Sequence, residues 1–206
     1  MAPVVMRDFV PADAAQVDAL GVAAFEQYQD FYNDWPALRE RIAGLSSLAE
    51  HGEIVVAEID GLIVGSVAYI GPGKPKSLFY QSEWAIMRML VVSPGAQGRG
   101  IGRMLADECI RRAQRDRAAV FALHTSEMMK VALPMYLRMG FARHADAPTT
   151  YGVRYAVYTR QLHPEDDARI PPDVKDRPAR RVQRPNRGVR YQSILDGLSF
   201  PANPNE

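Results

Sequence analysis

Apolar residues recur along the first 162 positions at spacings that alternate between those of strands and those of helices. Short apolar runs predict strands at residues 4–9, 53–59, 62–70, 86–92, 118–124, 141–144 and 151–162. Helical spacing predicts helices at residues 11–27, after Asp34, from about Gly100, and over 126–139. The pattern therefore predicts one domain that mixes strands and helices, an α/β (α+β) fold, over residues 1–162.

Four local signals sharpen these boundaries. Asp60-Gly61 separates two strand-like runs and predicts a hairpin. Asp34 can cap the second helix, and Gly140 can end the last one in a left-handed conformation. Pro134 lies inside that last predicted helix, where a missing N–H predicts a bend near Tyr136.

Composition limits the class of protein only broadly. A chain of 206 residues with 47% hydrophobic residues can form one globular domain with a real core, and a net charge of +1 excludes no partner. We expect a soluble, cytoplasmic protein that does not enter membranes, because no apolar run is long enough to span one and no signal peptide begins the chain. The single cysteine, Cys109, falls on an apolar helix face, which favours a packed core thiol.

Residues 163–206 differ in composition from the rest and predict an extended Pro/Arg-rich C-terminal tail. A tail that wraps the domain or the second subunit of a homodimer is favoured, with Tyr191, Leu195 and Phe200 among its apolar anchors. A solvated tail without function is the alternative. Nucleic acid is disfavoured as a partner, because the basic stretch lacks interleaved aromatic residues and the net charge of the whole tail is small.

The segment from Trp84 to Leu105 is where we place the chemistry. An apolar strand, broken only by Arg88, ends at Ser93-Pro94 and leads into a glycine-rich turn, Gln97–Gly102. Glycines there allow positive φ and a close approach to the backbone. The helix that follows points unpaired N–H groups at the turn, which favours anions, and Arg99 and Arg103 add positive charge. The turn therefore predicts a phosphate or pyrophosphate site.

Two familiar phosphate loops do not match. A Walker A loop needs Lys and then Ser or Thr after its last glycine, and Ile101 and Gly102 stand there instead. A dinucleotide fingerprint needs glycine where Arg103 stands, and no acidic residue follows at the expected distance. An ordinary glycine-rich turn without a ligand stays open as an alternative.

The spacing Gln97-x-x-Gly100-x-Gly102, after a strand that ends in LVVSP, resembles the pyrophosphate motif of the GCN5-related N-acetyltransferases (GNAT). A second match is Ala132-x-x-x-Tyr136-x-x-x-Gly140-Phe141, and the order of elements over residues 4–162 is similar too. The resemblance implies the GNAT fold. Its central sheet is mixed but largely antiparallel, has about six or seven strands, is splayed between two of them, and is flanked by helices.

The resemblance also implies acetyl-CoA as co-substrate, with no metal. Backbone groups of Leu90, Val91 and Val92 would bind the pantetheine arm, and a backbone N–H near Val92 or Met89 would face the thioester carbonyl. The pyrophosphate would lie on the amides of Gln97, Gly98, Arg99, Gly100, Ile101 and Gly102, beside Arg103. Met129 stands where the family often has asparagine, so Ser126 is the candidate for that coenzyme contact.

The same resemblance assigns Tyr136 as the general acid that protonates the departing thiolate. It leaves the general base open, because Ile86 occupies the position at which many members carry glutamate. Glu83 is our candidate, although it needs a bulge to reach the correct face. His124 and Glu26 are alternatives.

Aromatic residues cluster where an acceptor would enter, and they predict substrate contacts by Tyr28, Phe31, Tyr32, Trp35 and Tyr80. The predicted function is an N-acetyltransferase that acts on an amine of a small molecule or peptide. A coenzyme-binding sensor without catalysis and a partner-binding module that uses the basic tail are the alternatives.

Overall fold

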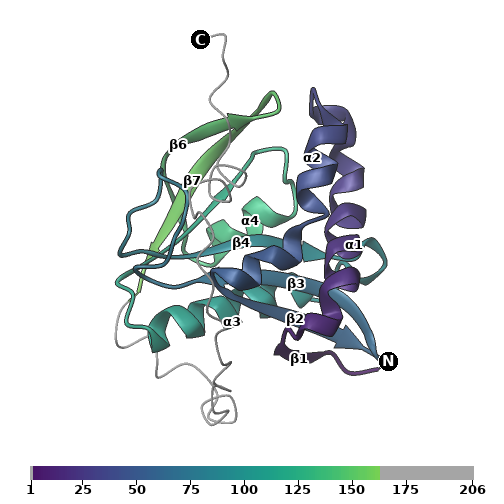
Figure 1. Cartoon of the computed structure of the whole chain (residues 1–206). Helices are drawn as coiled ribbons and strands as arrows, with labels where there is room; N and C mark the ends of the chain where they lie inside the picture. Colours follow the sequence, from purple (N-terminus) through teal and green to yellow (C-terminus); the bar gives the residue numbers. More distant parts are fainter. Residues whose placement is uncertain (1, 163–206) are drawn as a thin grey trace, which may run out of the picture.

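The computed structural model describes residues 2–162, which form one seven-stranded sheet with helices on both faces (Figure 1). The strand order is β1-β2-β3-β4-β5-β7-β6, and every neighbouring pair is antiparallel except β4 and β5. The strands are β1 (Val5–Asp8), β2 (Glu53–Ile59), β3 (Leu62–Ile70), β4 (Ala85–Val92), β5 (Val120–Thr125), β6 (Ala142–Thr150) and β7 (Val153–Gln161). The predictions made for the tail lie outside the described residues.

The helices form two layers, one on each face of the sheet. The layer nearer the viewer in Figure 1 holds α1 (Ala14–Phe25) and α2 (Trp35–Ile42), and α3 (Ile101–Arg115) and α4 (Ala132–Arg138) pack on the opposite face. Short 3₁₀ helices are η1 (Pro11–Asp13), η2 (Glu26–Phe31), η3 (Leu45–Glu50) and η4 (Pro94–Ala96). No helix within residues 2–162 has the length and apolar character needed to cross a bilayer.

Several local predictions are confirmed. Asp60 and Gly61 both have positive φ, 51° and 80°, and join β2 to β3 as a tight hairpin. The Asp34 carboxylate accepts a hydrogen bond of 3.0 Å from the amide of Ala37 and caps α2. Cys109 is fully buried in the core, and burial raises the pKa of its thiol.

The predicted splay lies between β4 and β5. These strands pair only at Ala85 with Phe121 and at Ile86 with Ala122, although β4 continues to Val92 along β3. β4 also carries a bulge, because Ser66 faces Val91 while Ala68 faces Arg88, and the extra residue Met89 has φ of 51°. Past Ile86, the edge of β4 that faces β5 therefore has no strand partner within residues 2–162.

The helix predicted over residues 126–139 is wrong in its first half. Residues 126–131 form turns, in which the amide of Met129 donates to the carbonyl of Ser126 at 3.0 Å, and α4 begins only at Ala132. Pro134 therefore falls in the first helical turn, where a missing N–H removes no intrahelical bond. The reason given for a bend near Tyr136 does not apply.

The end of α4 explains part of the second sequence motif. Gly140 has φ of +85°, and the amide of Phe141 donates to the carbonyl of Tyr136 at 3.1 Å. This is the hydrogen-bond pattern of a Schellman ending. The rings of Tyr136 and Phe141 meet edge to face with centroids 6.0 Å apart, so the motif fixes the position of Tyr136.

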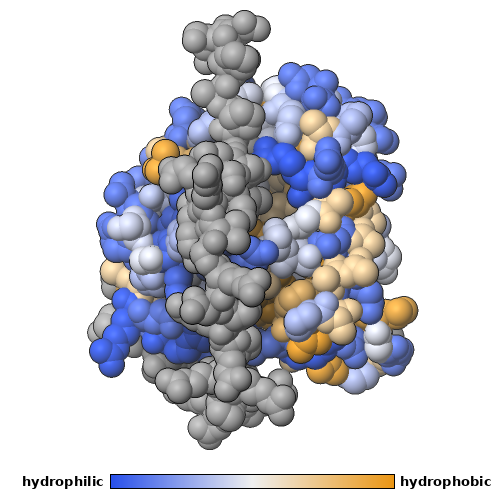
Figure 2. Space-filling model, viewed as in Figure 1, coloured by the Kyte–Doolittle hydropathy of each residue, from blue (hydrophilic) through white to orange (hydrophobic). Residues whose placement is uncertain are grey.

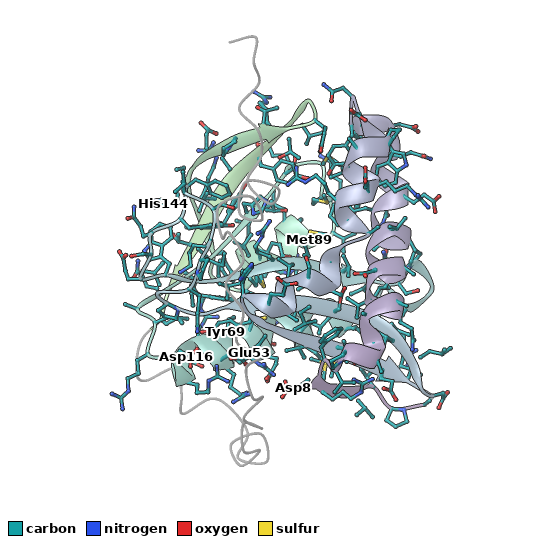
Figure 3. All side chains as sticks on the ribbon, viewed as in Figure 1. Asp8, Glu53, Tyr69, Met89, Asp116 and His144 are labelled. Carbon is teal, nitrogen blue, oxygen red and sulfur yellow. The ribbon has the colours of Figure 1, made fainter. Side chains whose placement is uncertain are left out.

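Charged groups hold α3 against the edge of the sheet. The buried guanidinium of Arg112 forms ion pairs with Asp8 of β1, Glu53 of β2 and Glu108 of its own helix. The Tyr69 hydroxyl donates to Asp116 at 2.9 Å at the end of the helix, and Figure 3 shows these groups together beside α3. Figure 2 shows hydrophobic surface around β1 and the β2–β3 hairpin, where Val5, Val10 and Leu62 are exposed.

Candidate active site

The glycine-rich turn has the backbone geometry that its sequence predicts. Gly98 has φ of +76° and Gly100 has φ of +79°. A Cβ atom at either position would meet no other atom within 4 Å, so the positive φ, not crowding, requires glycine there. Gly65 on β3 serves a different purpose. A Cβ atom there would lie 2.9 Å from Ile101, so its absence lets the start of α3 sit close to the sheet.

A row of free backbone N–H groups lines this turn. The first helical bond runs from the amide of Met104 to the carbonyl of Gly100, at 3.0 Å. No acceptor within residues 2–162 takes a hydrogen bond from the amides of 98–103. Gln97 differs from the prediction, because its amide donates to the carbonyl of Pro94 at 3.4 Å. The free row therefore runs from Gly98 to Arg103, one residue further along than expected.

The two arginines beside the turn already have contacts. Arg99 donates to the carbonyl of Ala2 at 3.3 Å, and Arg103 donates to the carboxylate of Asp107 at 2.8 Å, one helical turn further on. Both cations still add positive potential near the start of α3. The Arg103–Asp107 pair is solvent-exposed and would exchange readily for an anionic ligand.

A cavity of about 140 Å³ opens where β4 leaves β5. We call it the transfer cleft. Met87–Leu90 of β4 and Leu123–Thr125 of β5 form its floor, Met129 and Tyr136 close one side, and α2 and η3 close the other. Of the predicted coenzyme-binding strand residues, Leu90 lines the cleft, while Val91 is buried in the core below α1 and Val92 packs toward α3.

Tyr136 reaches the transfer cleft as predicted from its motif, although its side chain is only 6% exposed. Burial raises the pKa of its hydroxyl above the usual value of 10, so the proton stays on the oxygen throughout the physiological range. A buried, protonated hydroxyl at the wall of a cleft can donate a proton.

The predicted base, Glu83, is not brought to the transfer cleft. It lies exposed in the turn before β4, where its carboxylate accepts a hydrogen bond of 3.2 Å from the Ser82 hydroxyl. The bulge that would have turned it inward occurs later, at Met89, and does not act on this turn. Ile86 is fully buried against Tyr80 and Trp84 in an apolar cluster. Glu26 is exposed and also lies outside the cleft lining.

His124 is the one imidazole that the structure places in the cleft lining among residues 2–162. Its Nδ1 lies 2.8 Å from the Tyr80 hydroxyl. Burial, together with the nearby positive charge of Arg88, lowers the pKa of His124 to about 3. The ring is therefore neutral near pH 7 and has a nitrogen lone pair that can accept a proton.

None of the five aromatic residues predicted to bind substrate lines the transfer cleft. Tyr32 is buried, and its hydroxyl lies 2.6 Å from that of Tyr155, which does line the cleft. Tyr80 supports His124 in the same way. Tyr28 and Trp35 pack against the cluster around α2, and Phe31 is exposed. Tyr32 and Tyr80 thus position cleft residues and are absent from the lining itself.

Ser126 lies beside the transfer cleft but lines a second cavity, of about 270 Å³, between β5 and the β6–β7 hairpin. Its Oγ accepts a hydrogen bond of 3.4 Å from the amide of Met128. Met129, which replaces the expected asparagine, lines the transfer cleft instead.

The sequence analysis did not predict five polar residues of the transfer cleft: Thr125, Thr150 and the three larger side chains Arg41, Arg88 and Tyr155. The three larger ones come from α2, β4 and β7, which are distant in sequence. Arg88 gave one signal, because it is the only charged residue in an apolar strand run. A charge inside such a strand is costly unless a ligand or partner meets it.

A glycine turn with a free amide row, a splayed parallel pair and a cleft at the splay together suit an extended, anionic ligand. The sequence comparison identifies the class of protein. The family model described as "Acetyltransferase (GNAT) family" matches residues 20–141, more than half of the chain. The chain therefore belongs to the GNAT acetyltransferase family.

Solved structures show the same fold at low sequence identity. A GNAT-family acetyltransferase from Staphylococcus aureus Mu50 is 16% identical, with a TM-score of 0.63 over 78% of this chain and 100% of that one. A GCN5-related N-acetyltransferase from Rhodopseudomonas palustris is 21% identical, with a TM-score of 0.60 over 79% and 98%.

PaiA N-acetyltransferase from Thermoplasma acidophilum, solved in complex with coenzyme A, is 14% identical, with a TM-score of 0.58 over 78% of this chain and 99% of that one. No curated protein matches the sequence.

Proposed function

We propose that this protein is an acetyl-CoA-dependent N-acetyltransferase that acts on an amine of a small molecule or peptide. The observation that carries the proposal is the row of free amides at Gly98–Arg103, which follows β4. Past Ile86, the edge of β4 that faces β5 is also unpaired within residues 2–162. Family membership supports the reaction class.

The residues present fit coenzyme A. The free amides and the start of α3 suit a diphosphate, and the unpaired edge of β4 can bond the amides of a pantetheine arm as an added strand would. When bound, acetyl-CoA would supply an acetyl group on a thioester, which an amine can take with release of the free thiol.

The chain's own residues would perform three tasks. Backbone groups beside the bulge at Met89 offer hydrogen-bond donors to an oxygen in the cleft. The Tyr136 hydroxyl holds the proton that a departing sulfur needs. The neutral His124 ring can exchange a hydrogen bond with a group in the cleft, but its lowered pKa makes it a weak base, so the general base stays unassigned.

The test follows thiol release from acetyl-CoA with a panel of amines, and coenzyme A binding by calorimetry. Tyr136→Phe keeps the ring against Phe141 and removes only the hydroxyl. We expect kcat to fall by about tenfold or more, while the Kd for coenzyme A changes by less than about twofold. Tyr158→Phe is the matched control, because Tyr158 is equally buried and does not line the transfer cleft.

Unchanged turnover in Tyr136→Phe would remove the assigned acid. Coenzyme binding without thiol release for any amine would favour the sensor, an alternative consistent with the buried Ile86 at the usual base position. Absence of coenzyme A binding by the folded chain would contradict the whole proposal.

A further inference from the structure

Arg88 is the unusual charge of the transfer cleft. Its side chain extends from β4 into the cleft lining, and its guanidinium makes no hydrogen bond or ion pair with any residue from 2 to 162. Its Nε is buried without a partner in this part of the chain. Burial lowers the pKa of Arg88, but arginine does not lose its proton in proteins, so the charge persists.

Several other arginines of residues 2–162 pair with carboxylates. Arg7 meets Asp13, Arg111 meets Glu108, and Arg115 meets Glu53, each at 2.7 Å or less. These pairs lie at the surface or at the edge of the sheet, where solvent already reduces the cost of a charge. Arg88, which extends into the cleft, has no such partner among residues 2–162, so an anionic ligand in the cleft would be able to pair with it.

The charge of the cleft lining has one sign. Arg41 of α2 lines the same cleft, and its positive charge further lowers the pKa of Arg88. No aspartate or glutamate of residues 2–162 belongs to the lining. Figure 3 shows the neighbouring Met89 at the middle of the molecule, where β4 passes between α2 and α4.

The rest of the wall is mostly apolar. Leu38, Ile42 and Leu45 face the cleft from the α2 side, and Met87, Met89 and Met129 face it from the sheet and α4 side. Such a wall favours a ligand with an apolar substituent of modest size. It offers no negative charge to a ligand that carries additional positive charge.

Arg88 also lies close to the place proposed for transfer. It is two residues from Leu90 on β4, with the bulge residue Met89 between them, and both line the cleft. An anion held by Arg88 would therefore belong to the same small molecule as an amine that reaches the bulge.

On the premise of the proposed activity, we infer that the acceptor is a small apolar amine that carries a carboxylate or phosphonate, as an apolar amino acid does, and that Arg88 binds this anion. The planar guanidinium can donate two parallel hydrogen bonds to either group. Polycationic amines are excluded by Arg41 and Arg88.

The experiment compares acceptors that differ only in the anion. Thiol release is measured with L-leucine, its aminophosphonate analogue, leucinamide, 3-methylbutylamine and spermidine. We expect kcat/KM for the two anionic acceptors to exceed that of the neutral pair by about tenfold or more, with spermidine poorest. The carboxylate and phosphonate arms show which anion is preferred.

Arg88→Met keeps the length and apolar character of the side chain and removes the charge. It should lower kcat/KM for L-leucine by about 30-fold or more, through KM, and leave leucinamide nearly unchanged. Arg88→Lys should recover part of the loss. Arg39→Met is the control, because Arg39 is exposed on α2 and does not line the cleft.

A binding measurement keeps the inference testable without turnover. N-acetyl-L-leucine should raise the melting temperature of the coenzyme A-loaded protein, N-acetyl-L-leucinamide should not, and Arg88→Met should abolish the difference. Equal effects of the two compounds, no effect of either, or equal turnover of anionic and neutral amines overturns the inference. Failure of the proposed function would show instead as a protein that binds no coenzyme A.

Discussion

His124 lies at the carboxyl end of β5 among aromatic rings. The centroids of Phe79 and Tyr155 are each 5.5 Å from its own, and the Tyr80 hydroxyl meets its Nδ1. Such packing, with Arg88 nearby, favours the neutral imidazole in the folded protein. Protonation of His124 therefore destabilises the folded protein relative to the unfolded chain.

This coupling predicts how acid affects stability. The pKa of His124 is lowered from 6.5 to about 3 on folding, so the unfolded chain binds more protons than the folded one between these values. Stability from this residue is complete above pH 6.5 and is lost as pH falls toward 3. We expect about 2 kcal/mol to be lost by about pH 5, as measured by urea unfolding.

His124→Gln cannot titrate and should show a shallower loss of unfolding free energy over the same range. The control is His144→Gln, because His144 is exposed and stands beside Trp84, away from the cleft (Figure 3). Parallel curves for the wild-type protein and His124→Gln would contradict the environment assigned to His124.

Residues differ in how far sequence reveals their role. The position of Tyr136, though not its proposed role, could be predicted, because a short motif ends its helix and places its ring. Arg41 and Tyr155 could not be predicted, since they reach the cleft through contacts between α2, β7 and the splayed strands. Tyr32 was predicted to contact substrate, but it is buried in the cluster around α2. The sequence could not distinguish these two cases, because an aromatic loop residue can pack into the core as readily as it can contact a ligand.

At the scale of elements, the connection from β4 to α3 combines three features that each come from sequence. Ser93-Pro94 ends the strand, Gly98 and Gly100 take positive φ, and Gly65 lets the helix start approach β3. The amides of 98–103 face outward as a result and stay free. Their alignment depends on the backbone at Gly100, the N-cap of α3.

Gly100→Ala tests this dependence. A Cβ atom at φ of +79° strains the backbone by roughly 1–2 kcal/mol, and relief would tilt the first amides of α3. We expect KM for acetyl-CoA to rise by about fivefold or more with little change in kcat. Gly61→Ala is a close match, with φ of +80° and the same open space around its Cβ, but it lies in the β2–β3 hairpin.

Both variants should lose similar stability in thermal unfolding, and only Gly100→Ala should bind the coenzyme less tightly. An equal KM in the two variants would indicate that the free amides of the turn do not hold the cofactor.

Elements also show where local pattern misleads. Residues 126–131 have apolar positions at helical spacing, yet the Ser126 hydroxyl binds the amide of Met128 and favours a turn. Met129 then packs beside the cleft without being helical. The bulge at Met89 could not be predicted from the sequence either. In a continuous apolar run, the hydrophobic pattern does not change when one extra residue is inserted.

At the scale of the whole molecule, hairpins could be predicted and long-range strand order could not. Asp60-Gly61 specifies β2 next to β3 locally. The position of β7 between β5 and β6 depends on pairing across α4 and agrees with the family fold that the resemblance implied. Ion pairs of Arg112 then join β1, β2 and α3, segments separated by up to about half the chain.

The proposed division of the chain at residue 162 is the remaining whole-molecule prediction. Every group assigned to the coenzyme, the transfer cleft and the acceptor lies within residues 2–162, and the family match ends at 141. A chain that ends at Leu162, which is buried against the core, should therefore fold and retain the site. We expect its Kd for coenzyme A and its kcat to lie within about threefold of the full chain, by calorimetry and thiol release. A folded, truncated chain that binds coenzyme A normally but has lost turnover would show that residues 163–206 supply part of the acceptor site, and loss of coenzyme binding would extend that conclusion to the cofactor.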